Sequence, residues 1–388
     1  MKQYVSELWY HGSTRANLVN VVVGTLAVII ATYLVYSIFV NLFDFRFLTG
    51  PYGSPDRSAI FVFLHVEASD PRWLGMLKGA GNTISVVVFA IALASLLGLF
   101  VGVARLSTNP ILNRLGGIYV ETFRNLPLLL LMFFFAFGVF RSLPQIEART
   151  GIDGFFMVSN RGIAVPWLAG AHDFWWLWMI ALFAGGAVAL WVRRRREQQE
   201  DLTGQTMHGN AWALAIFLGV GVVSYVLLLF PLRPALPEVV QSDAGFFAYQ
   251  HGALLGLGYI SALVSVTLYF GAFIAEIVRG SIQAVPHGQV EAASSLGFTT
   301  YQRFTLVVLP QALRIMIPAL NNEFQNTNKD STLAHVIAFG EIVLISNRIV
   351  NNAGNLLQVY LFIFIVFIVT NLIISTIMNT INKNVQLK

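Results

Sequence analysis

Cysteine is absent from this chain of 388 residues, and charged residues are scarce at 11%. Without cysteine, disulfide bonds, thiolate metal sites and cysteine nucleophiles are excluded. Soluble domains carry roughly a quarter charged residues, whereas 56% of this chain is hydrophobic. The composition is therefore that of an integral membrane protein. The basic residues lie mostly at the ends of apolar segments and form no continuous basic face, which argues against nucleic acid binding.

The sequence also lacks the motifs of several catalytic classes. No glycine-rich loop ends in the lysine that a phosphate-binding Walker A loop requires. The histidines are scattered, with neither an HExxH motif nor a pair spaced by four residues, so we expect no metal site. The GxSxG motif of serine hydrolases is missing as well. We therefore expect a membrane protein that is not an enzyme and carries no cofactor of its own.

What the chain does contain is long apolar runs, each near the ~20 residues that a bilayer-spanning helix needs. Eight spans are predicted, at residues 18–43, 82–104, 118–140, 174–192, 211–230, 256–276, 309–325 and 356–378. The predicted fold class is all-α, a polytopic transmembrane helix bundle of about eight spans joined by loops. Eight crossings place both termini on one side, and the excess of lysine and arginine on that side predicts that it is cytoplasmic.

Two features of these spans allow more than one interpretation. Arginines 193–196 follow the fourth span and are interpreted as a stop-transfer anchor, with a lipid head group or a partner protein as the alternative. Gly98 and Gly102 have the GxxxG spacing that permits close helix contact. They either form a specific dimer contact or are ordinary small residues of a membrane helix.

The stretch 275–313 is helical in pattern yet polar, and it lies between two strongly apolar segments. Pro286 ends the first helix, because the residue before a proline is pushed away from the helical region. A short helix is favoured over 289–296, and Gly297 follows where a left-handed residue commonly ends a helix. Thr299 or Thr300 can cap the next helix. The stretch predicts a short helix, a tight glycine turn and a helix that re-enters the bilayer.

This hairpin resembles the EAA motif of ABC importer permeases. The matching residues, with valine at 307 where the family usually has isoleucine, are Glu291, Ala292, Ala293, Gly297, Val307, Leu309 and Pro310. The blocks that resemble the polar amino acid branch of the family, of the histidine/glutamine permease type, lie at 119–128, 275–280, 283–289 and 329–333. The whole layout is most similar to the longer permease subunits of general L-amino acid and glutamate/glutamine/aspartate/asparagine importers.

The resemblance implies an architecture. A type I importer core of five helices would comprise the second, third, sixth, seventh and eighth spans. The implied regions are an N-terminal extra span with an outer loop (1–78), core spans (79–142), inserted loops with an extra helix pair (143–255), and core spans (256–388) that carry a cytoplasmic coupling hairpin at 281–310. The location implied is the bacterial inner membrane, with both termini in the cytoplasm.

The resemblance also implies partners and a mechanism. Two ATPase subunits would hold ATP and Mg, so none is expected on this chain. A second, related permease and a periplasmic amino-acid-binding protein would complete an importer that moves polar L-amino acids by alternating access. By the same resemblance, the residues that would seat the hairpin in the ATPase are Gln289, Glu291, Ala292, Ala293, Gly297 and Phe298.

The seventh span is too polar to face lipid along its whole length. Polar groups at membrane depth tend to face a cavity or the bundle interior. The predicted pathway residues are therefore Asn322, Glu323 and Asn326, with Ser265 and Tyr269 of the sixth span as weaker candidates. The alternative is that the polar stretch lies at the wet outer interface.

Two charged pairs have the three-residue spacing that brings side chains together on one helix face. They are Glu121 with Arg124, and Glu276 with Arg279. Each is interpreted either as an interfacial ion pair or as a gating or helix-locking contact.

Other functions stay open from the sequence. An ABC importer of another small polar solute would look much the same. An ion-coupled secondary transporter would call for inverted repeats and titratable groups near the bilayer midplane, and neither is evident. A membrane scaffold without a pathway would gain nothing from the polar seventh span.

Overall fold

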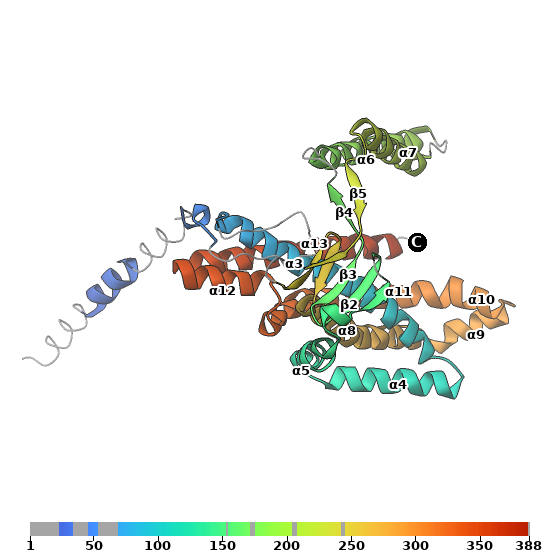
Figure 1. Cartoon of the computed structure of the whole chain (residues 1–388). Helices are drawn as coiled ribbons and strands as arrows, with labels where there is room; N and C mark the ends of the chain where they lie inside the picture. The colour runs from blue at the N-terminus through green and yellow to red at the C-terminus, as the bar shows by residue number, and fades with distance from the viewer. Residues whose placement is uncertain are drawn as a thin grey trace, which may run out of the picture.

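A computed structural model describes residues 23–33, 46–52, 69–152, 154–170, 175–203, 208–241 and 245–386. Long helices run alongside one another, and a separate helix pair, α6 and α7, stands apart from them (Figure 1). The long helices are α3 (Arg72–Ala104), α6 (Trp175–Thr203), α7 (Gly209–Leu227), α8 (Leu257–Gln283), α11 (Leu309–Asp330) and α13 (Leu356–Gln386). The shorter α-helices are α4 (Pro110–Asn125), α5 (Leu128–Phe133), α9 (His287–Ser295), α10 (Thr300–Gln302) and α12 (Ile342–Ala353).

Tighter and wider helical turns connect these elements. The 3-10 helices are η1 (Arg46–Thr49), η3 (Phe140–Ser142), η4 (Ile146–Ala148) and η6 (Ser331–Ile337). Two π-helical turns, η2 (Phe134–Val139) and η5 (Arg303–Val308), continue α5 and α10.

The described residues contain six helices long and apolar enough to cross a membrane. A seventh span results if the pair Pro110–Asn125 and Leu128–Ser142, bent by 102°, is counted as one. The predicted span at 18–43 lies mostly outside the described residues, and its described part, Val23–Tyr33, is helical. The predicted helix bundle of about eight spans is thus confirmed. The predicted third span is not straight, because Pro127 breaks it between α4 and α5.

Helix α8 is the centre of the bundle, and it packs most extensively against α3. Their contact is close because Gly98 and Gly102 of α3 lack a side chain. A Cβ added at Gly98 would lie 2.5 Å from Ile274 Cγ2, and one added at Gly102 would lie 2.7 Å from the carbonyl oxygen of Ala275. The GxxxG spacing therefore serves a contact within this chain.

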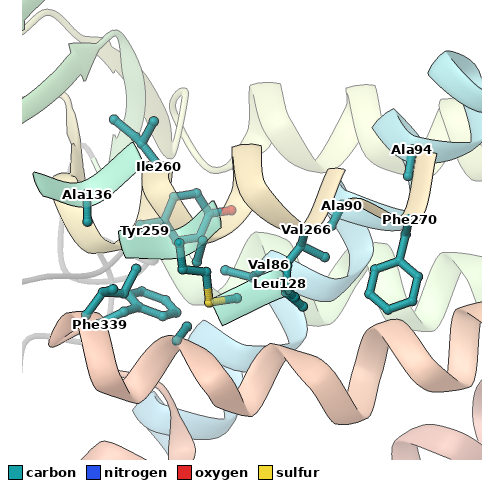
Figure 2. Packing of buried hydrophobic residues seen from close by; sticks show 14 of the residues in the cluster. Val86, Ala90, Ala94, Leu128, Ala136, Tyr259, Ile260, Val266, Phe270 and Phe339 are labelled. Carbon is teal, nitrogen blue, oxygen red and sulfur yellow. The ribbon is translucent and has the colours of Figure 1, made fainter. Parts of the chain in front are cut away.

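The largest buried cluster lies around α8 and is drawn in Figure 2. Helix α3 supplies small side chains to it, whereas α8 supplies aromatic and branched ones, so the two surfaces interdigitate. The residues labelled in the figure are Val86, Ala90, Ala94, Leu128, Ala136, Tyr259, Ile260, Val266, Phe270 and Phe339.

Several helices run past the ends that hydropathy predicted. Helix α3 begins at Arg72, ahead of the predicted start at 82, and α6 continues through the arginine run to Thr203. Helix α11 extends to Asp330 and α13 to Gln386. Hydropathy reports where the bilayer ends, but arginine, glutamine and glutamate are good helix formers, so the backbone stays helical beyond it.

The predicted outer loops at 141–173 and 231–250 contain seven short strands in their described residues, and an eighth, β8, follows just before α8. One antiparallel sheet has the order β1 (Thr150–Ile152), β2 (Phe156–Ser159), β3 (Gly162–Val165) and β8 (Ala253–Gly256). Two ribbons pair β4 (Trp167–Gly170) with β5 (Leu232–Ala235) and β6 (Glu238–Gln241) with β7 (Phe247–Gln250). Reading these segments only as loops was wrong, because strands of three or four residues gain stability from partners far along the chain, as in the pairing of Ile163 with Leu255.

The segment after α11, predicted as a partly apolar outer stretch, folds as η6 and α12. Glu341 caps α12: its carboxylate accepts hydrogen bonds from the backbone N–H groups of Val343 (2.9 Å) and Leu344 (2.8 Å). The Asn82 side chain of α3 donates to the carbonyl oxygen of Gly340 at 2.7 Å. Burial raises the pKa of Glu341 to about 7, although both backbone hydrogen bonds oppose the rise.

The buried carboxyl of Glu341 predicts a pH-dependent stability. Between about pH 4.5 and 7 the folded protein holds a proton at Glu341 that the unfolded chain has lost, so the contribution of Glu341 to the free energy of unfolding falls as pH rises. We expect the melting temperature to be lower at pH 8 than at pH 5.5, and the difference to shrink in Glu341→Gln. An equal pH dependence in the two proteins, measured in one detergent, would exclude Glu341 as its source.

Candidate functional site

The hairpin between α8 and α11 has the predicted local structure. Pro286 precedes α9, and Gly297 lies just beyond its end with φ of +78°. The N–H of Phe298 donates to the carbonyl oxygen of Ala293 at 3.2 Å, which closes the turn. Thr299 accepts from the N–H of Gln302, whose side chain accepts in return from the N–H of Thr299, so this pair forms a capping box. The predicted short helix, glycine turn and returning helix are confirmed.

The hairpin projects beyond the ends of the long helices, where α9 and α10 are seen at one extreme of the molecule (Figure 1). Of the six residues predicted to seat it in a partner, Gln289, Glu291, Ala292 and Gly297 are exposed, Phe298 is half-buried and Ala293 is buried. Two further apolar side chains, Leu296 and Tyr301, are 74% and 77% exposed. Large exposed apolar groups at a projecting tip mark a protein contact. Sequence reasoning passed over both, because neither belongs to the motif.

Polar contacts fix the two arms of the hairpin to each other. The Arg303 guanidinium of η5 donates to the Ser294 hydroxyl of α9 at 2.7 Å and to the Thr300 hydroxyl at 3.0 Å. The π-helical turn that begins at Arg303 ends just before Pro310, which has no N–H to donate. These contacts hold α9 to α10 and η5, which lead directly into α11, as one unit.

A groove of about 690 Å³ runs beside this unit, between the start of α11 and the end of α13. Its walls are mostly apolar, with a few polar side chains among them. The lining residues include Leu306, Val307, Pro310, Leu313, Arg314 and Ile381.

A network of charges lies where α3 and α8 end. Glu276 of α8 forms ion pairs with Arg279, as its spacing predicted, and also with Arg105 at the end of α3. Arg279 donates in turn to the side chain of Gln283. The Glu276 side chain is 26% exposed. Arg105 was missed because it is far from Glu276 in sequence, so the contact is visible only once α3 packs on α8.

Loss of the Glu276 carboxylate should weaken this end of the bundle. In Glu276→Gln, two half-buried guanidinium groups keep their positions without a counter-charge, which we expect to lower the free energy of unfolding by about 1–3 kcal/mol. The measurement is the melting temperature of the purified protein. Glu121→Gln is the matched control, since Glu121 is exposed and forms no ion pair with Arg124. Equal melting temperatures for the two variants would show that the Glu276 carboxylate does not stabilise the fold.

The second predicted pair, Glu121 and Arg124, does not form. Both side chains are exposed on α4, and the Arg124 guanidinium lies over the Phe273 ring of α8, 5.1 Å from its centre. Arg124 also lies within electrostatic range of Glu323 on α11. Helix spacing alone allowed the pair, but α4 packs on α8, so the Arg124 side chain meets Phe273 instead.

The predicted pathway residues fall in different surroundings. Glu323 and Tyr269 are half-buried, and Asp330 lies within electrostatic range of both. Asn322 and Asn326 are exposed on α11. Ser265 is instead fully buried inside the bundle, where its hydroxyl has no hydrogen-bond partner. The cluster brings together charges from α4 and α11 beside Tyr269 of α8, and Arg124 and Asp330 are the members that sequence reasoning did not place in it.

Asn328, near the end of the polar run on α11, faces another helix. Asn328 is buried, and its amide donates to the Thr370 hydroxyl at 2.9 Å and to the Asn371 side chain at 3.0 Å, both on α13. The polar seventh span therefore divides into a half-buried charged face and a face that packs on α13.

This sequence is similar to those of known proteins. Residues 208–387 match the family described as "Binding-protein-dependent transport system inner membrane component". The general L-amino acid transport system permease protein AapQ of Rhizobium johnstonii is 34% identical over 88% of this chain and 84% of its own length. This chain belongs to that permease family.

Other relatives match over almost the whole permease. A putative amino-acid ABC transporter permease of Escherichia coli, YhdX, is 32% identical over 97% of this chain and 95% of its own. The glutamate/glutamine/aspartate/asparagine permease BztB of Rhodobacter capsulatus is 29% identical, over 99% and 96%. A solved structure described as an amino acid ABC transporter with histidines is 18% identical, covers 80% of this chain and 94% of its own, and has a TM-score of 0.46. Its family and its sequence relatives show that the protein is a multi-pass membrane subunit of a transport system.

Proposed function

We propose that this permease imports polar L-amino acids as one of the two membrane subunits of an ABC importer. The observation that carries the proposal is the projecting hairpin of α9 and α10, with its glycine turn and exposed apolar tip, in a chain of this permease family. The relatives AapQ and BztB are named for general L-amino acids and for glutamate, glutamine, aspartate and asparagine, and both align over most of their length. These names support polar amino acids over another solute.

The partners follow from the same reasoning. Two ATPase subunits, which hold ATP and Mg, dock on the two permeases, one on the hairpin of each. On this chain the contacts are Gln289, Glu291, Ala292, Gly297 and Phe298, joined by Leu296 and Tyr301, and the buried Ala293 supports the short helix from within. BztB and BztC of Rhodobacter capsulatus bear the name of one transport system and both resemble this chain. This supports a second, different permease in the complex. A periplasmic binding protein delivers the amino acid to the outer side.

The membrane arrangement that we propose places the protein in the bacterial inner membrane with both termini and the hairpin in the cytoplasm. Helices α3, α4 with α5, α8, α11 and α13 form the importer core, since α3, α4, α5 and α11 pack on α8 and α13 packs on α11. The region 143–255 is an addition to this core, and so is 1–78, most of which lies outside the described residues. ATP-driven closure of the ATPases would move α9, and the contacts of Arg303 would pass the movement to α11.

The charged cluster of α4, α8 and α11 is the pathway site in this proposal. An amino acid carries an α-carboxylate and an α-ammonium group. Arg124 is placed to attract the carboxylate, while Glu323 and Asp330, beside the Tyr269 ring, attract the ammonium. Asn322 and Asn326 on the same helix offer further donors and acceptors. The Glu276 network with Arg105 and Arg279 locks the inner ends of α3 and α8, as a gate contact would.

Arg124→Gln tests the pathway site. Loss of a charge-assisted hydrogen bond to the substrate carboxylate should slow uptake roughly tenfold. Binding-protein-stimulated ATP hydrolysis should continue, which would show that the ATPase subunits are still engaged. Arg114→Gln, an exposed arginine of the same helix, is the matched control. If both variants take up amino acids at the wild-type rate, Arg124 has no part in substrate binding.

The transport function is tested with the whole complex, purified and reconstituted in liposomes with ATP inside and the binding protein outside. We expect uptake of labelled glutamate or glutamine that needs ATP and is competed by other polar L-amino acids. Uptake driven by an ion gradient without ATP would establish a secondary transporter instead. If the complex takes up a different solute and no amino acid, the proposed substrate class is wrong, whereas the proposed ABC importer function stands.

A further inference from the structure

The Arg124 side chain of the charged cluster is held by an aromatic ring and not by a carboxylate. Its guanidinium lies over the Phe273 ring of α8, 5.1 Å from the ring centre. Within the part of the chain that the structure describes, Arg124 forms no hydrogen bond and no ion pair. A long side chain without such a contact samples many rotamers and loses that freedom when it binds a ligand. The ring is therefore the group that fixes where the guanidinium lies.

Phe273 can hold a neighbouring side chain because its own ring is fixed. Phe273 is half-buried on α8, where its ring centre lies 5.0 Å from that of Tyr269 and 6.3 Å from that of Phe270. Phe270 is buried in the largest hydrophobic cluster (Figure 2) and anchors this group of rings. The position of the Phe273 ring is thus set by the core of the bundle.

Helix α4 is also fixed against α8 close to Arg124. The Tyr119 hydroxyl donates to the carbonyl oxygen of Leu268 at 2.7 Å. Gly271 makes room for this contact, since a Cβ added there would lie 2.8 Å from the Tyr119 oxygen. The Tyr119 ring in turn meets the ring of Phe123, 5.0 Å away between ring centres, directly before Arg124 in the chain. The two helices are therefore held together independently of the Arg124 side chain.

The nearby opposite charge is not bonded to Arg124. Glu323 of α11 lies within electrostatic range of Arg124, but no ion pair joins these two described residues. The Asn326 side chain is instead the polar neighbour of the Glu323 carboxylate. A guanidinium stacked on a ring keeps its N–H edge available, and that planar edge matches the two oxygens of a carboxylate. The Arg124 edge is therefore open to a carboxylate from outside the chain.

We propose that Phe273 is a positioning residue for transport, which orients the Arg124 guanidinium toward the α-carboxylate of the amino acid. The inference rests on the pathway site of the proposed function. Orienting a side chain in advance favours binding, because less freedom is lost when the ligand arrives. Leucine at position 273 would still pack on α8 but offers no ring face to a cation, whereas tyrosine keeps the face. The two replacements separate the ring from its bulk.

The test measures uptake of labelled glutamine by the whole complex in liposomes, with ATP inside and the loaded binding protein outside at saturation. The complexes compared are wild type, Phe273→Leu, Arg124→Gln and the double variant. We expect Phe273→Leu to slow uptake roughly two- to fivefold, from the strength of an exposed cation–π contact. In the Arg124→Gln background the same change should have no further effect, because no guanidinium is left to orient.

Three further variants control for packing. Phe273→Tyr keeps the ring and should take up glutamine close to the wild-type rate. Phe273→Met, a second replacement without a ring, should match Phe273→Leu. Phe100→Leu makes the same change at a side chain of α3 that is 70% exposed, and it should transport as wild type does. Binding-protein-stimulated ATP hydrolysis, measured on each complex, shows that its subunits are assembled.

Each other result decides against the inference. If Phe273→Leu slows uptake by the same factor with arginine and with glutamine at position 124, Phe273 does not act through Arg124. Wild-type uptake by Phe273→Leu, or slow uptake by Phe273→Tyr, would show that the ring face is not needed. Failure of the pathway site itself looks different, because Arg124→Gln alone would then transport at the wild-type rate, and that result would overturn the site and this inference together.

Discussion

Gly297→Val should abolish coupled transport while the permease still inserts in the membrane. Gly297 has φ of +78°, and a Cβ added there would meet nothing within 4 Å, so the effect comes from the backbone alone. A residue with a Cβ loses roughly 1–2 kcal/mol in the left-handed region, and a β-branched side chain is less tolerated still. Because about 1.4 kcal/mol corresponds to tenfold, we expect uptake and binding-protein-stimulated ATP hydrolysis to fall at least tenfold.

Gly288→Val provides the matched control for that variant. Gly288 lies on the same hairpin inside α9, with an ordinary backbone conformation and open space around it. The Gly288→Val variant should transport near the wild-type rate. Normal coupling in Gly297→Val, or an equal loss in both variants, would show that the turn itself does not transmit movement.

Gly102→Val should prevent the bundle from assembling. The new Cβ would lie 2.7 Å from the Ala275 carbonyl oxygen and 2.8 Å from Val278 Cβ, so α3 and α8 would have to move apart. Overpacking a well-packed core costs roughly 1–3 kcal/mol, and here the atom in the way is backbone, which cannot turn aside. We expect little or no protein in the monodisperse fraction after detergent extraction.

Gly280→Val separates this clash from a general effect of replacing glycine in a membrane helix. Gly280 lies on α8, and nothing would lie within 4 Å of its Cβ. That variant should extract with a wild-type yield. If Gly102→Val also extracts and migrates as wild type does, the close approach of α3 and α8 is not needed for folding.

What the sequence predicted well was encoded locally. Pro286, Gly297 and Thr299 act on the backbone within a few residues of themselves, and the hairpin has the structure that each of them favours. Apolar length likewise locates the spans, because crossing a bilayer depends on the segment itself. The ends of the helices were less predictable, since α6 stays helical through arginines that leave the hydrocarbon.

What the sequence did not predict depends on contacts between distant segments. Strand β3 pairs with β8 across an insertion that contains α6 and α7, and neither strand has a strong signal of its own. Arg105 meets Glu276 only because Gly98 and Gly102 let α3 approach α8. Arg124 had a plausible partner three residues away, yet it lies over Phe273 because α4 packs on α8.

The charged cluster shows the same division between local and distant information. Polarity in the seventh span indicated that part of α11 faces something other than lipid. It did not distinguish Glu323, which lies within electrostatic range of Arg124 on α4, from Asn328, which binds α13. Only the placement of the three helices assigns each polar residue to its face.

The most direct test of the account uses the absence of cysteine, which makes any introduced cysteine unique. Leu296→Cys places a thiol on the exposed tip of the hairpin, and Phe246→Cys, at a site 70% exposed beside β7, is its counterpart on the strand side. We predict that a membrane-impermeant maleimide reaches position 296 only from the cytoplasm and position 246 only from outside, and that a thiol cross-linker joins position 296 to an ATPase subunit. Labelling of position 296 from outside, or no cross-link to an ATPase in the purified complex, would contradict the account.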